Sequence, residues 1–143
     1  MHRTLLLLPA LALGLLAACG DDDGTGSGSG GAPPAGGITV VASDWNGWDR
    51  DHEPTPVSRT LAAEEGAAVS VPCPVGGPVE VRVESVDGDG AVLRTDDAMA
   101  PEGETGGSNL NDLTDRFELP AGDVVRFDTP TLDAGCGFEV TWA

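Results

Sequence analysis

The sequence contains no lysine and no tyrosine, and aromatic residues occupy only 4% of its 143 positions. All seven basic residues are therefore arginines, against 24 acidic residues, and the formal net charge is -17. Because proteins neutralise nucleic-acid phosphates with clustered basic residues, this balance argues against nucleic acid as a partner. It argues equally against direct electrostatic adhesion to anionic lipid. Cationic ligands and basic partner proteins fit the charge, which also keeps an exported protein soluble.

Histidine and cysteine are scarce as well, and this limits the chemistry of the chain. Of two histidines, only His52 lies beyond the first residues. A blue-copper site needs two histidines and a free cysteine, and a catalytic zinc site usually needs more histidine than this. No serine lies in a Gly-x-Ser-x-Gly motif. We expect a non-catalytic protein without a cofactor, and a hydrolase that uses His52 as its base is the alternative.

The chain also lacks a hydrophobic run long enough to cross a membrane. Residues 5–17 are apolar except for Pro9 and Gly14, but a membrane-spanning helix needs about 20 apolar residues. The run follows Met1-His2-Arg3, which carries a positive charge. A positive start and a short apolar middle are typical of a secretory signal peptide.

The motif Leu16-Ala17-Ala18-Cys19 ends this run, and it resembles the lipobox of bacterial lipoproteins. The resemblance implies that residues 1–18 are cleaved as a signal peptide and that Cys19 carries a diacylglycerol with chains such as palmitate. Two acyl chains anchor a protein stably. The expected location is therefore the extracytoplasmic face of the cell membrane. An ordinary signal peptide with an incidental cysteine is the alternative.

Glycine, serine, aspartate and proline dominate the segment that follows, residues 19–37. Such a composition cannot bury enough apolar surface to offset the entropy of ordering the chain. A flexible linker of this length has a root-mean-square reach of about 20–25 Å. We interpret it as a tether between the membrane and one folded domain, residues 38–143.

Two cysteines, Cys73 and Cys136, remain in that domain. In an oxidising exterior such a pair normally forms a disulfide. Closing a loop of this length contributes at most about 4 kcal/mol of stability in the chain-entropy model. A free catalytic thiol is the alternative, but the sequence offers it no obvious histidine partner.

Alternating apolar and polar residues predict strands through much of the domain. Three valines alternate with charged residues over residues 79–84, and the turn motif Asp87-Gly88-Asp89-Gly90 leads into a second apolar segment, so a hairpin is expected. Residues 60–69 and 117–125 each contain two apolar segments around a glycine turn. The pattern predicts an all-β fold, an antiparallel β-sandwich of about seven strands.

The C-terminal residues point to the same class. Cys136, Phe138, Val140 and Trp142 alternate onto one strand face. The motif Asp133-Ala134-Gly135-Cys136-Gly137-Phe138 resembles Asp-x-Gly-x-Tyr-x-Cys, the entry to the F strand of immunoglobulin domains. Here the aromatic residue comes one position later and the cysteine precedes it. The resemblance implies an immunoglobulin-like sandwich, with the disulfide joining two inward faces.

Three segments are less regular. Residues 61–65 have good helix propensity and could form a helical turn in place of a strand end. Residues 95–116 are rich in glycine and polar residues, which predicts a long loop. A short helix around residues 111–115 is an option within that loop.

The densest set of functional groups lies in residues 44–53 and includes two of the three tryptophans. A tryptophan beside carboxylates can stack on a sugar or a cationic group while the acids accept hydrogen bonds. Alternatively, one tryptophan closes the end of the sandwich and the charges are simply solvated. The predicted ligand-binding residues are Trp45, Trp48, Asp49, Asp51, His52 and Glu53.

Calcium is the one metal that this segment suggests, since Asp49, Asp51 and Glu53 offer several hard oxygen ligands. Their spacing begins like that of an EF-hand, but Pro54 follows where a calcium loop of that kind needs glycine. An irregular calcium site is the remaining form. Asp87 and Asp89 are better explained as turn formers.

Taken together, these features predict a membrane-anchored extracytoplasmic lipoprotein with a non-catalytic binding domain. The expected partners are an envelope protein first, then a glycan or a cationic small molecule, with no nucleic acid. Besides the hydrolase that uses His52, the other alternative is a structural accessory subunit of an envelope complex. Such a subunit would present a contiguous apolar patch.

Overall fold

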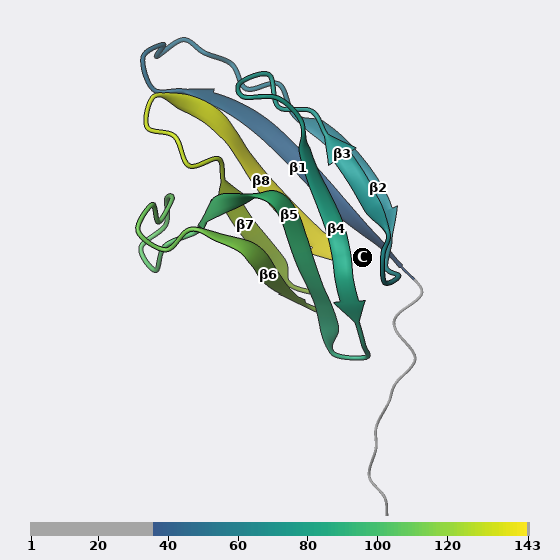
Figure 1. Cartoon of the computed structure of the whole chain (residues 1–143). Coiled ribbons are helices and arrows are strands. Elements are labelled where there is room, and N and C mark those ends of the chain that lie inside the picture. Colours follow the sequence, from purple (N-terminus) through teal and green to yellow (C-terminus); the bar gives the residue numbers. More distant parts are fainter. Residues whose placement is uncertain (1–35, 143) are drawn as a thin grey trace, which may run out of the picture.

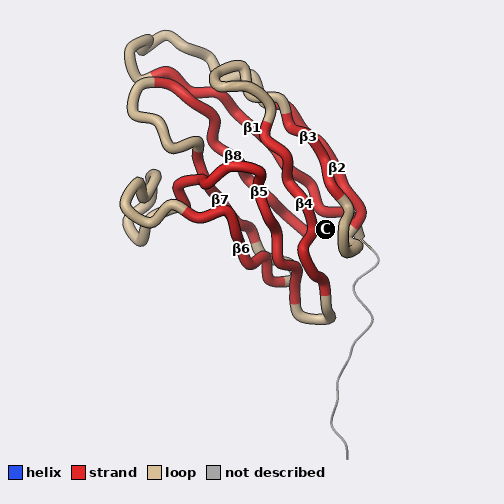
Figure 2. Tube along the Cα trace, in the orientation of Figure 1, coloured by secondary structure: helices blue, strands red, loops and turns tan. Residues whose placement is uncertain are grey.

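The computed structural model describes residues 36–142, which form strands, loops and turns without a helix (Figure 1, Figure 2). In this part of the chain, accordingly, no helix is long and apolar enough to span a bilayer. The signal peptide, Cys19 and all but the end of the linker, as predicted from the sequence, lie outside the described residues. The eight strands are β1 (Gly37–Asn46), β2 (Val57–Ala62), β3 (Ala68–Val71), β4 (Val79–Val86), β5 (Gly90–Pro101), β6 (Thr114–Pro120), β7 (Val124–Asp128) and β8 (Ala134–Trp142).

All paired strands are antiparallel, in the order β2-β1-β8-β7-β5-β4-β3, and β6 also pairs with β5. Strand β5 joins two parts of this sheet. Its first half pairs with β4 and β6, the register shifts between Arg94 and Met99, and Ala100 and Pro101 then pair with β7. The sheet therefore curls around a core, and its end strands β2 and β3 contact each other (Figure 1). This confirms the all-β antiparallel prediction, with eight strands in place of about seven.

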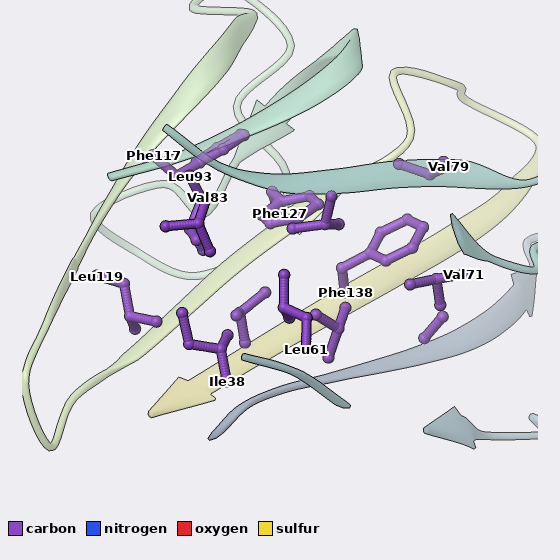
Figure 3. Packing of buried hydrophobic residues seen from close by; sticks show 14 of the residues in the cluster. Ile38, Leu61, Val71, Val79, Val83, Leu93, Phe117, Leu119, Phe127 and Phe138 are labelled. Atoms are coloured by element: carbon purple, nitrogen blue, oxygen red, sulfur yellow. The ribbon is translucent and has the colours of Figure 1, made fainter. Parts of the chain in front are cut away.

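Alternation along each strand builds the core. In β1 the side chains of Ile38, Val40 and Ala42 are buried, and the residues between them are half-buried. The valines of residues 79–84 and the C-terminal set ending at Trp142 are buried on the inner face, as predicted. Because the side chains of a strand alternate between its two faces, the apolar residues share one face. Burying that face against the facing part of the sheet removes it from water (Figure 3).

All three phenylalanines of the chain stack at the centre of this core. Phe117 of β6 and Phe127 of β7 have ring centroids 4.3 Å apart, and Phe127 lies 5.2 Å from Phe138 of β8. Phe127 is 1% exposed, so its ring lies wholly inside (Figure 3). Aromatic pairs contribute about 0.5–1.5 kcal/mol beyond the area that they bury.

A disulfide joins Cys73 and Cys136, with the two Cα atoms 6.0 Å apart and a sequence separation of 63. Cys73 follows β3 and Cys136 lies in β8, and both are buried in the core. The predicted pairing of two inward-facing cysteines is confirmed. The bridge fastens the end of β3 to the strand that β1 and β7 flank.

The predicted loop over residues 95–116 is wrong at both of its ends. Strand β5 continues to Pro101 and β6 begins at Thr114, so the connection covers only residues 102–113. Thr95, Met99 and Ala100 are buried along the extension of β5, but exposed Asp96 and Asp97 hide the alternation in the sequence. The optional short helix around residues 111–115 is also wrong, because those residues form a turn and the start of β6.

The predicted turns agree with the structure. Asp87 Oδ1 accepts the backbone N–H groups of Asp89 (2.9 Å) and Gly90 (3.0 Å), which closes the hairpin between β4 and β5. In the two similar segments, Gly66 and Gly122 take positive φ values of 83° and 78° at the turns. Residues 61–65 therefore end β2 and enter a turn, and the helical alternative is not adopted.

Candidate binding surface

The strand directions give the molecule two distinct ends. The chain enters at Gly37, and β1 is 10 residues long, so its far end lies about 33 Å away at about 3.3 Å per residue. Because successive strands alternate in direction, the near end holds the short connections, residues 63–67, 87–89 and 121–123. The far end, which we call the distal end, holds residues 47–56, 72–78 and 129–133, and residues 102–113 project sideways next to the ends of β5 and β7 (Figure 1). These four segments are here named the distal loops.

Exposed apolar side chains concentrate in the distal loops. Six large hydrophobic residues are exposed in the described part of the chain, and five of them lie in these loops. Trp48 is 79% exposed and Leu132 is 80% exposed. A backbone hydrogen bond of 2.8 Å from Gly47 N–H to Asp133 C=O joins the loops that carry them. The other four residues are Val75, Leu110, Leu113 and, at the near end, Val124.

Asp44, near the end of β1, holds the loop that carries Trp48. Its Oδ1 accepts the backbone N–H of Thr55 at 2.7 Å, and its Oδ2 lies 2.9 Å from Nε2 of His52. Asp44 is 9% exposed and His52 is half-buried. The Nε2–Oδ2 contact is an ion pair when His52 is protonated, and its geometry does not meet the criteria for a hydrogen bond.

The hydrogen bond from Thr55 lowers the pKa of Asp44, and the positive charge of protonated His52 lowers it further, against the opposing effect of burial. Asp44 therefore stays ionised when other aspartates begin to take up protons. The carboxylate fixes both Thr55 and His52 across the base of the loop.

Two more side chains shape the tip of the same loop. Asn46 Oδ1 accepts the N–H groups of Trp48 (2.9 Å) and Asp49 (3.3 Å). Asp49 Oδ1 accepts the N–H of Asp51 at 3.0 Å. Such side-chain-to-backbone bonds replace a regular turn. They hold the backbone around Trp48 in one conformation although its ring projects into solvent.

The structure separates the two tryptophans that were predicted to act together. Trp45 belongs to β1 and is half-buried, and its ring lies against Gly135 of β8, where a Cβ atom would be only 3.1 Å from the ring. Trp48 lies beyond the strand and is exposed. Trp45 therefore covers the sheet and Trp48 faces outward.

The acidic residues of the predicted site are exposed, and they do not converge. Asp49, Asp51 and Glu53 all lie at the surface of the loop. Within residues 36–142, no three His, Cys, Asp or Glu side chains gather as they would around a metal ion. The calcium hypothesis therefore gains no support from this loop.

The surroundings of His52 in the described part of the chain consist of a carboxylate partner and no nucleophile. Its side chain is paired with Asp44, and no hydroxyl or thiol hydrogen-bonds to it there. The pair therefore has a visible role in holding the loop.

Sequence reasoning missed two residues of this surface. Asp44 continues the inward-facing alternation of Ile38, Val40 and Ala42, and an acid at such a position signals a buried partner. Leu132 is a single apolar residue within a short polar connection. Its proximity to Trp48 depends on the pairing of β1 with β8, which no local pattern reveals.

Most arginines of the described strands form ion pairs with carboxylates outside the loops that carry Trp48 and Leu132. Arg82, Arg94, Arg116 and Arg126 each form an ion pair with at least one carboxylate on a strand or its flank. Arg50 is the one arginine within the distal loops. The surface around Trp48 and Leu132 therefore combines apolar side chains with an excess of negative charge.

No family model, curated protein or solved structure matches the chain when it is compared with known proteins. The functional conclusion therefore depends on the chain's own residues. The clearest of them are Trp48 and Leu132, on adjacent loops at the distal end.

Proposed function

We propose that the chain is an exported lipoprotein whose domain binds a protein partner in the cell envelope through the distal loops, without catalysis. The observation that carries this proposal is the position of the exposed apolar side chains. Five of six lie in the distal loops, opposite the point where the chain enters the domain. Exposed apolar residues that gather on one part of a surface, with polar neighbours around them, are typical of interaction sites.

The composition of the surface favours a protein partner over a small ligand. Tryptophan is enriched among the residues that dominate interface energies, usually with a polar rim around them. Here Trp48 and Leu132 form the apolar centre, and Asp49, Asp51 and Asp133 supply an acidic rim. Opposite charge steers association and selects partners. The partner should therefore present an apolar pocket bordered by arginine or lysine.

The proposed anchor explains why the binding surface would lie far from the point where the chain enters the domain. A diacylglycerol on Cys19 would hold the N-terminal side at the membrane, and the linker would add about 20–25 Å of reach. The length of β1 would then place Trp48 still farther from the lipid headgroups. A binding surface at the distal end is the one best placed to meet a partner outside the membrane.

We assign the fold to the β-sandwich class with an immunoglobulin-like outline. The two sets of paired strands that β5 joins support a sandwich, as does the disulfide between inward-facing residues. Long loops at one end of such a sandwich are a common place for recognition.

A photo-crosslinker tests the proposed function. A photoreactive amino acid at position 48, in the cells that produce the protein, should give one adduct of discrete mass. Leu132→Asp in the same chain should abolish the adduct, because it places a charge at the apolar centre of the surface. The matched control carries the photoreactive residue at position 124, which is exposed at the opposite end. Equal adducts from positions 48 and 124 would refute a specific distal surface.

The anchor has its own test. Mass spectrometry of the N-terminal peptide should find Cys19 as the first residue, heavier by a diacylglycerol. A Cys19→Ser variant should leave the membrane fraction. An unmodified Cys19 in the membrane-bound protein would rule out the lipoprotein assignment while leaving the distal surface untouched.

A further inference from the structure

The outer face of the sheet carries a hollow that does not include Trp48 or Leu132, although Glu102 at the start of one distal loop lines its edge. Strands β1, β8 and β7 lie side by side (Figure 1), and their register places Ser43 beside Gly137 and Gly137 beside Asp128. Since Gly137 has no side chain, the middle of this row is open. The hollow has a volume of about 310 Å³, which is within the usual range of small-molecule pockets.

The glycine is needed for the shape of this hollow. A Cβ atom at Gly137 would lie 2.8 Å from Oδ1 of Asp128. The Asp128 carboxylate therefore extends over Gly137, and any larger residue there would push it away. The other oxygen, Oδ2, accepts a hydrogen bond of 2.7 Å from the hydroxyl of Ser108, which fixes the carboxylate in place.

The groups around the hollow accept more hydrogen bonds than they can donate. Three carboxylates line it, those of Glu102, Asp128 and Glu139, against one guanidinium, that of Arg126. Arg126 is already paired, at 2.9 Å with Glu139 and at 3.8 Å with Glu102. Asp128 Oδ1 is left without a protein donor in the described part of the chain. A ligand that fits must therefore bring donors and positive charge.

A bare metal ion is not the best match, since within residues 36–142 no metal-holding group of His, Cys, Asp or Glu occurs. The carboxylates lie around a volume much larger than one ion needs. We propose that the hollow over Gly137 binds an organic cation with an alkylammonium or guanidinium group, which donates to Asp128. The cation could belong to a free polyamine or to a lysine or arginine side chain of another protein.

Two probes distinguish these sources: spermidine, and a short uncharged peptide with one central lysine. The ¹⁵N-labelled full chain is produced in its own host and purified in detergent. Each probe is then titrated into it, and the NMR chemical shifts of the Gly137 and Asp128 backbone amides are followed. We expect saturable shifts with at least one probe, and the tighter probe identifies the source. Asp128→Asn should weaken binding about tenfold or more, since a charge-assisted hydrogen bond is lost.

Gly137→Ala should abolish the shift changes, because its methyl group fills the hollow. If Gly137→Ala fails to fold, the weaker binding expected of Asp128→Asn still tests the proposal. Glu65→Gln removes one negative charge from an exposed turn at the near end, and it should leave the affinity unchanged. The proposal is overturned if neither probe gives saturable shifts. It is equally overturned if Glu65→Gln weakens binding as much as Asp128→Asn, since the attraction would then be nonspecific. Neither result bears on Trp48 and Leu132, which do not line the hollow.

Discussion

At the scale of single residues, Phe127 is the centre of the core. Its ring stacks between those of Phe117 and Phe138, so one side chain connects β6, β7 and β8. The only other aromatic ring in the described core is that of Trp142, which lies at the near end beside Ile38 and cannot replace Phe127.

Truncation of this ring should therefore be costly. Phe127→Ala is expected to lower the free energy of unfolding by about 3–5 kcal/mol, because it removes buried apolar surface and leaves a cavity. Phe127→Leu, which keeps most of the volume, should cost much less. Urea denaturation of the three proteins measures the difference. Equal losses for both variants would show that stacking and not volume matters at this position.

Asp44 gives a pH-dependent contribution at the same scale. Its pKa is lowered in the folded protein, first by the Thr55 N–H. The stabilisation is therefore complete above the unfolded-state pKa of an aspartate, about 3.9, and is lost as the pH falls through the lower folded-state value.

A comparison of the wild type with Asp44→Asn tests the direction of this pH dependence. The stability advantage of the wild type should shrink as the pH falls from about 5 to about 3. Urea denaturation at a series of pH values measures it. Glu104→Gln, an exposed charge in another distal loop, serves as the control and should show no such trend. An advantage that grows on acidification would contradict the assignment.

At the scale of elements, the disulfide fastens the end of β3 to β8 across the core. Removing it in Cys73→Ala/Cys136→Ala frees a segment of 63 residues in the unfolded state. The free energy of unfolding should fall by about 4 kcal/mol on the chain-entropy model. The wild type with a reducing agent should show the same fall in stability. A change below about 1 kcal/mol would mean that the unfolded chain is already compact.

Strands whose pattern is local were predictable, and strands defined by distant contacts were not. The valines of β4 and the alternating end of β8 predicted their own positions and buried faces. The end of β5 did not, because Asp96 and Asp97 interrupt its apolar pattern and Ala100 pairs with β7, a strand distant in sequence. The turn at Asp87 was predictable because its own side chain closes it.

The candidate surface was predictable only in part for the same reason. The sequence placed Trp45 and Trp48 in one polar segment, and the structure puts Trp45 in β1 and Trp48 in the loop beyond it. Their separation follows from the end of β1 at Asn46, after which the chain leaves the sheet. The contribution of Leu132 needed the register of β1 against β8.

At the scale of the whole molecule, the two ends of the domain differ in their loops and in their exposed side chains. The near end, where the chain enters, holds only short turns, and the longest connections and most of the exposed apolar side chains lie away from it. With a net charge of -17, the molecule repels anionic surfaces and attracts basic proteins. The proposed anchor at one end and the proposed recognition surface at the other fit this arrangement.

Hydroxyl-radical footprinting compares the protein on intact cells with the purified protein and tests this account most directly. We predict that Trp48 and Leu132 are oxidised several-fold less on cells, where the partner covers them, while Val124 at the near end reacts equally in both. Protection confined to the near-end turns, or equal oxidation of Trp48 in both samples, would contradict a partner at the distal loops.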